Sequence, residues 1–171
     1  RGESPVVSAA EPLGVWQRDL SFVDVRAVPG VRYYYWVEAA IDRVGSRASG
    51  FAAALNSAVP LQRPLAPLVE EAEGNSVLLN WSTVEGGRYY RVYRAEREDI
   101  RLARPLSNWQ QNLSFADVSA RPGVRYYYWI EVATDAAGRL KSGLSDAASR
   151  FLSMPAPDEI SASQGSFFAQ I

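Results

Sequence analysis

Pro122-Gly123-Val124-Arg125-Tyr126-Tyr127-Tyr128-Trp129 occurs twice in this chain, because the residues from Pro29 to Trp36 have the same sequence. In both places a Pro-Gly turn signal precedes a run of large aromatic side chains. Aromatic and β-branched residues fit the pleated surface of a sheet, so each copy predicts a strand that begins after the turn. The second copy continues through Ile130-Glu131-Val132, which lengthens that strand.

Side chains in a strand alternate between two faces, and this alternation divides the run. The inward set is Tyr126, Tyr128, Ile130 and Val132, and the outward set includes Tyr127 and Trp129. Two earlier runs show the same period. They place Val77, Leu79 and Trp81 on one face of a first strand, and Tyr90 and Val92 on the inner face of a second. Short strands of this kind, separated by turn signals such as Glu85-Gly86-Gly87, predict an all-β domain.

The repetition extends far beyond the aromatic run. Trp16 and Trp109 are 93 residues apart, and so are Trp36 and Trp129. The register continues without a gap from Arg1 and Arg94 to about Gly50 and Gly143. A period of this length is too long for a solenoid unit and suits a repeated small sandwich domain.

Composition removes several classes of function. The chain has 171 residues, a net charge of −1, no His and no Cys. A His general base, a Cys nucleophile, a zinc site and a disulfide are therefore excluded within it. The charge argues against a nucleic-acid partner, because such proteins carry a basic face that displaces counterions. No apolar run is long enough to insert in a membrane, and no cofactor motif is present, so we expect no cofactor and no metal.

The order and spacing of these motifs resemble those of a fibronectin type III domain of bacterial-type surface or secreted proteins. The matching segments are Ala66-Pro67, Trp81, Tyr90 to Arg94, Phe115-Ala116-Asp117, Pro122 to Tyr126, and Ser142 to Ser145. The resemblance implies an immunoglobulin-like β-sandwich in a tandem array. It also implies that Tyr126, and Tyr33 in the first copy, cap the sandwich through a hydrogen bond to nearby backbone. The charged span from Glu96 to Arg104 is longer than the usual connection, and we expect either a helical turn or an irregular crossover there.

Aligned on this pattern, the chain divides into four parts. Residues 1–59 correspond to the C-terminal half of a repeat, 60–65 to a linker, 66–152 to a complete repeat, and 153–171 to a linker and the first strands of a third. The half-repeat lacks its first three strands, so other strands must complete it. They come either from chain upstream or from residues 155–171 of a neighbouring chain. We favour upstream chain, because donation of two strands would leave the third absent.

Outward-facing aromatic residues are the candidate interface. In the complete repeat they are Tyr127 and Trp129, joined on the neighbouring strand by Tyr89, Arg91 and Tyr93; in the first copy they are Tyr34 and Trp36. One interpretation is cross-strand pairing within the domain, in which the rings and the arginine cover one another. The other is a contact face for neighbouring repeats or identical chains, or a platform on which a sugar stacks.

We expect a structural or adhesive repeat segment without catalytic residues, in a long extracellular or cell-surface protein such as a filament or stalk. The alternative is an accessory module, a spacer or a carbohydrate-contacting domain, of a secreted polysaccharide-degrading enzyme. The length of the whole gene discriminates between them, because fold alone does not decide function.

Overall fold

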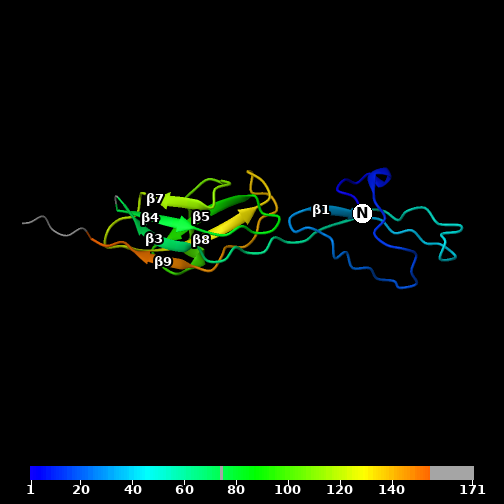
Figure 1. Cartoon of the computed structure of the whole chain (residues 1–171), viewed down its shortest axis with the longest axis horizontal. Helices are drawn as coiled ribbons and strands as arrows, with labels where there is room; N and C mark the ends of the chain where they lie inside the picture. Colours follow the sequence, from blue (N-terminus) through cyan, green and yellow to red (C-terminus); the bar gives the residue numbers. More distant parts are fainter. Residues whose placement is uncertain (74, 155–171) are drawn as a thin grey trace, which may run out of the picture.

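The computed structural model describes residues 1–73 and 75–154 and is built from antiparallel strands (Figure 1). The strands are β1 (Arg32–Tyr35), β2 (Leu55–Ala58), β3 (Leu68–Ala72), β4 (Ser76–Asn80), β5 (Tyr89–Ala95), β6 (Arg104–Pro105), β7 (Ser114–Asp117), β8 (Arg125–Ala133) and β9 (Ala148–Phe151). Two 3-10 helices, η1 (Val7–Ala9) and η2 (Ile100–Leu102), complete the elements. The first strands expected of a third repeat fall in residues 155–171, outside the described residues.

Strands β3 to β9 form a sandwich of two sheets. One sheet has the order β3-β4-β7 and the other the order β6-β5-β8-β9. In the larger sheet, Val92 of β5 lies opposite Ile130 of β8. In the smaller one, Leu79 of β4 lies between Val69 of β3 and Phe115 of β7. This is the all-β, immunoglobulin-like arrangement expected from the sequence.

The core lies between the inner faces of the two sheets, where the alternation places it. Its buried side chains include Val77, Leu79, Trp81, Tyr90, Val92, Tyr126, Tyr128, Ile130 and Val132. Burial alternates along β5, whereas almost all of β8 is buried. Because β8 has partners on both edges and cover on both faces, the longest strand is also the most enclosed.

The charged span after β5 resolves the choice that the sequence left open. Most of it is an irregular crossover, and η2 forms a single 3-10 turn within it. Asp99 begins this turn, because its carboxylate accepts a hydrogen bond from the backbone N–H of Arg101 at 3.0 Å. Such a side-chain cap satisfies an N–H group that the turn itself cannot pair.

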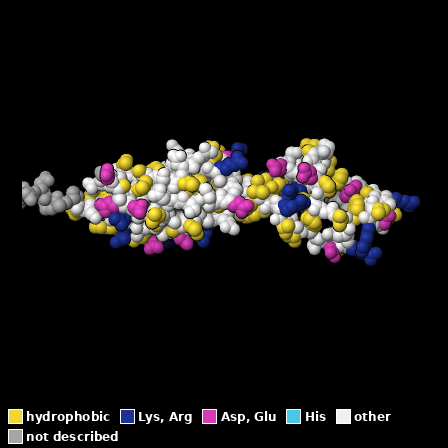
Figure 2. Space-filling view, viewed as in Figure 1, with side chains coloured by type: hydrophobic (Ala, Val, Ile, Leu, Met, Phe, Trp, Pro, Cys, Tyr) yellow, Lys and Arg dark blue, Asp and Glu magenta, His cyan; other side chains and the backbone are white. Residues whose placement is uncertain are grey.

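Residues 1–59 form a much smaller sheet of β1 and β2 alone. The sequence predicts a strand equivalent to β8 in this part, but β1 ends at Tyr35. The cause is the missing counterpart of β5: β8 pairs with β9 only as far as Tyr128 and continues beyond it on β5 alone, whereas residues 1–59 contain counterparts of only the last two residues of β5. In this part Val37 is 71% exposed, whereas Ile130, its counterpart 93 residues later, is 0% exposed. Figure 2 accordingly shows hydrophobic side chains on the surface of this part of the molecule.

Replacing Trp81 tests the register of β4. Trp81→Ala should lower the free energy of unfolding of the sandwich by about 3–5 kcal/mol, as for a large aromatic side chain removed from a core. Trp81→Phe should cost less, because the indole N–H has no hydrogen-bond partner to lose. Urea unfolding followed by circular dichroism measures both; an unchanged midpoint for Trp81→Ala would mean that the side chain faces solvent.

Candidate functional site on the outer sheet face and at the domain joint

The predicted interface residues of the sandwich lie on one side of the larger sheet, which we call the outer face. Tyr93 pairs with Trp129 and Arg91 pairs with Glu131 across β5 and β8. Tyr89, Arg91, Tyr93 and Tyr127 are all half-buried. These residues therefore lie together on one face and are partly covered, so they do not form a bare platform.

Trp129, which the alternation places on the outer face, is only 2% exposed and is therefore covered within the domain. It packs with Ala95 and Ala103, and with Leu144 and Ala147 from the segment before β9. The crossover that begins at Glu96 folds back over the sheet and brings Ala103 onto this ring. Strand alternation gives the correct face, but it does not show that a connection covers that face.

A hydrogen-bonded network occupies the middle of the outer face. The hydroxyl of Tyr93 donates to Glu131 Oε2 at 2.7 Å, and Lys141 Nζ lies 2.9 Å from Glu131 Oε1. Burial, together with the carboxylate of Glu131, raises the pKa of Tyr93 to about 12. Both oxygens of Glu131 are engaged within the domain, so this carboxylate is not available as a general base.

Arg91 is held by its own domain. Its Nε donates to the carbonyl of Ser107 at 3.0 Å. Its guanidinium carbon lies 5.8 Å from the ring centre of Trp109 and 6.0 Å from that of Tyr93. These contacts support the interpretation in which the aromatic rings and the arginine of the outer face cover one another within the domain. Trp109 was not among the predicted surface residues, although its repetition as Trp16 is a signal that could have identified it.

In the first copy, Tyr34 and Trp36 are also half-buried, with ring centres 6.5 Å apart. The Trp36 ring lies beside Gly2, whose backbone pairs with Tyr34. Pairing within residues 1–59 therefore accounts for much of the cover on these two rings.

A buried polar cluster links the two sheets of the sandwich. Asp117 of β7 accepts hydrogen bonds from Arg94 Nη1 at 2.6 Å, Tyr128 Oη at 2.9 Å and Ser119 Oγ at 2.7 Å. Burial alone would raise the pKa of Asp117, but these hydrogen bonds outweigh it and hold that pKa below its usual value. The same arrangement recurs 93 residues earlier, where Asp24 accepts from Arg1 at 2.7 Å and from Tyr35 Oη at 3.1 Å.

The two capping tyrosines differ from each other. The hydroxyl of Tyr33 accepts from the backbone N–H of Val28 at 3.5 Å, as the resemblance implies. The hydroxyl of Tyr126 accepts instead from Arg121 Nε at 3.3 Å. Arg121 stands where the first copy has Val28, so only in the sandwich can a side chain supply this donor.

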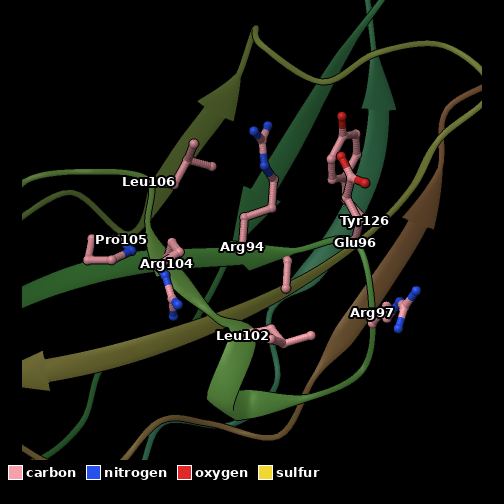
Figure 3. Close-up of a pocket in the computed structure, with 9 residues that line it drawn as sticks. Arg94, Glu96, Arg97, Leu102, Arg104, Pro105, Leu106 and Tyr126 are labelled. Carbon is pink, nitrogen blue, oxygen red and sulfur yellow. The ribbon is translucent and has the colours of Figure 1, made fainter.

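A pocket of about 360 Å³ lies beside Arg94, between the crossover and the start of β8 (Figure 3). Its arginines do not converge on a common point. Arg94 is paired with Asp117, while Arg104 donates to the carbonyls of Arg101 and Ala103. Figure 3 shows the side chains of Arg97 and Arg104 diverging from Arg94. The pocket therefore lacks the convergent donors that an anion site needs.

The second candidate region is the joint between residues 1–59 and the sandwich, formed by Pro29, Gly30, Leu61, Gly86 and Thr134. Leu61 is 7% exposed and belongs to the core of the sandwich. A Cβ atom on Gly30 would lie 2.6 Å from Thr134 Cγ2 and 2.9 Å from Leu61 Cδ2. A Cβ on Gly86, whose φ is +76°, would clash with the carbonyl of Pro29, so only glycine allows this approach.

Sequence reasoning placed Leu61 in a linker and missed its burial. The available signal was a single large apolar residue between Pro60 and Pro64. Proline stiffens such a connection, and a buried side chain then fixes its direction.

Within residues 1–73 and 75–154, no three His, Cys, Asp or Glu side chains gather where they could hold a metal ion. In the same part of the chain, no helix is long and apolar enough to cross a bilayer.

The pH dependence of Asp117 gives the first test of the polar cluster. Its lowered pKa stabilises the fold above the unfolded value of about 3.9, and this contribution is lost as pH falls through the folded pKa. Asp117→Asn should cost about 3–5 kcal/mol at neutral pH, because Arg94 loses its buried partner. Urea midpoints between about pH 3 and pH 7 should fall with acid in the wild type and fall less in the variant. The exposed Asp146→Asn should behave as the wild type, and identical pH profiles for all three proteins would contradict a role for Asp117.

The hydroxyl of Tyr93 gives the second test, at alkaline pH. Its raised pKa favours the neutral hydroxyl in the folded state, so stability should fall as pH rises from about 10 towards 12. NMR of tyrosine labelled with ¹³C at Cζ should show this residue titrating near 12, and Glu131→Gln should move its pKa towards 10. Tyr93→Phe identifies the signal; titration near 10 in the wild type would show that the Glu131 contact is absent in solution.

Comparisons with known proteins agree with this architecture. The family model described as "Fibronectin type III domain SaeA third domain" matches residues 68–152, just under half of the chain. A search of curated proteins found no match.

Several solved structures are similar at low identity. "Structure of FN3tt mut" is 22% identical with a TM-score of 0.43, covering 53% of this chain and 94% of that one. A Fn3-like protein from Clostridium thermocellum is 15% identical with a TM-score of 0.44, covering 56% of this chain and 95% of that one. Pectate lyase PelI from Erwinia chrysanthemi is 20% identical with a TM-score of 0.43, covering 51% of this chain and 28% of the lyase. Such similarity transfers no activity; the family match and the observed sheets show that residues 68–152 have the immunoglobulin-like sandwich fold of fibronectin type III domains.

Proposed function

We propose that this chain is a non-catalytic structural or adhesive segment of a long extracellular or cell-surface protein, in which such domains follow one another as a filament or stalk. The observation that carries this proposal is the joint. Leu61 sits in the core of the sandwich while the Pro29-Gly30 turn abuts the loop at Gly86. A buried connection of this kind transmits position from one unit to the next, which is what a stalk requires.

The chemistry of the side chains supports a role without catalysis. The carboxylates of Asp24, Asp117 and Glu131 are all engaged by cations or hydroxyls of the same chain. The chain has no His or Cys to serve as a base or nucleophile. Sandwiches of this architecture are common in cell-surface proteins, which supports the proposed location.

Neighbouring repeats or identical chains are the proposed partners. The exposed Val37 lies where the sandwich buries Ile130. Strands equivalent to those of the smaller sheet would cover this face, whether they come from the same chain or from a neighbouring one. The accessory-module alternative needs an exposed aromatic platform for carbohydrate, and the burial of Trp129 makes the outer face less suitable for that purpose.

The joint can be tested by polar substitution of Leu61. Leu61→Ser should destabilise the sandwich by about 2–5 kcal/mol, as for the loss of a large core side chain, and should release residues 1–59 to move separately. ¹⁵N relaxation should give one rotational correlation time for the wild type and two for the variant. Leu65→Ser is the matched control, because Leu65 lies in the same linker and is 78% exposed.

Two results would contradict the proposal. One is a pair of correlation times in the wild type, since the joint would then be flexible. The other is equal behaviour of Leu61→Ser and Leu65→Ser, since burial of Leu61 would then contribute nothing.

A further inference from the structure

The far end of the sandwich repeats one half of the joint. Gly30 donates its backbone N–H to the carbonyl of Val59 at 2.8 Å, and Gly123 donates to the carbonyl of Leu152 at 2.9 Å. Both glycines have nearly the same φ, +76° and +77°. The turn and the strand that leaves the domain therefore have the same local structure at both places.

Met154 stands where Leu61 stands, 93 residues later. A Cβ on Gly123 would lie 3.5 Å from both Cγ and Sδ of Met154, so this side chain already folds over the turn, as Leu61 folds over Gly30. Their surroundings differ greatly: Leu61 is 7% exposed and Met154 is 73% exposed. The difference is that Leu61 is covered by the next domain.

We propose that Pro122, Gly123 and Met154 form an end surface that docks the loop end of a second domain of this same kind. The inference rests on the proposed function and extends it to a named surface and its occupant. Met154 would enter the core of the incoming domain between the two sheets, as Leu61 does in the sandwich. The flexible thioether side chain of methionine suits a pocket built by another domain.

The joint also defines what the occupant must present. It needs a turn like Glu85-Gly86-Gly87, because the carbonyl of Pro29 leaves no room for a Cβ at Gly86. It needs a small side chain at the position of Thr134, whose Cγ2 meets Gly30. An incoming turn with any residue other than glycine at this position could not dock on the end surface, because its Cβ atom would collide with a backbone carbonyl there, as it would at Gly86.

An extended chain tests the end surface directly. Residues 1–154 are followed by a second copy of residues 62–152, so that Met154 stands before the appended domain as Leu61 stands before the sandwich. Met154 is the only methionine of the protein, and the initiator methionine is removed, so one methyl signal and one oxidation site report on it. We expect its oxidation by hydrogen peroxide to slow about tenfold relative to the original chain, since exposure controls methionine oxidation. We also expect its ¹³C-methyl resonance to shift.

Two control proteins complete the test. One has a flexible Gly-Ser insertion after Met154, and the other has Thr134→Arg in the appended copy only. Both should keep a folded appended domain, checked by its backbone amide spectrum, and both should restore fast oxidation. Equal oxidation rates and methyl shifts in all proteins with a folded appended domain would overturn the proposal. That outcome would leave the Leu61 result unaffected, so failure of the end surface is distinguishable from failure of the proposed function.

Discussion

The carboxylate of Asp117 is the constraint on which the sandwich depends. It lies on β7 of the smaller sheet and accepts from Arg94 and Tyr128, which belong to the two central strands of the larger sheet. A buried charge is costly unless it is paired and hydrogen-bonded, so the two sheets must keep the alignment in which both of these donors reach it. Apolar packing alone would tolerate small shifts between the sheets, whereas this ion pair does not. Its recurrence as Arg1, Asp24 and Tyr35 shows that the same requirement is present in the first copy, even where one sheet is missing.

The joint extends this rigidity beyond one domain. The guanidinium carbon of Arg94 also lies 4.4 Å from the ring centre of Tyr126, near the start of β8. At the near end, Leu61 joins the linker to the core that the cluster aligns. Packed side chains and backbone contacts therefore connect the linker to the core of the sandwich.

Much of this fold could be predicted from sequence because its determinants are local. Alternation along the run from Tyr126 to Val132 gives the inner face, and the 93-residue register gives the repetition. Trp129 could not be placed, because its cover comes from Ala103 and Ala147, small residues distant in sequence whose role depends on the path of two connections. The polar cluster was missed for a similar reason: Asp117 reads as a turn residue until Arg94 and Tyr128 are brought next to it.

The joint shows a second limit of prediction from sequence: the composition of a linker indicates its stiffness but not its orientation. A linker rich in proline predicts a stiff extended connection, and Pro60 and Pro64 fit that description. Stiffness alone, however, does not fix the angle between two domains. The angle is set by Leu61 entering the core and by the lack of a side chain at Gly86, where two backbones meet. One apolar residue and one glycine therefore determine how the linker meets the sandwich, and neither is recognisable without the surface that it contacts.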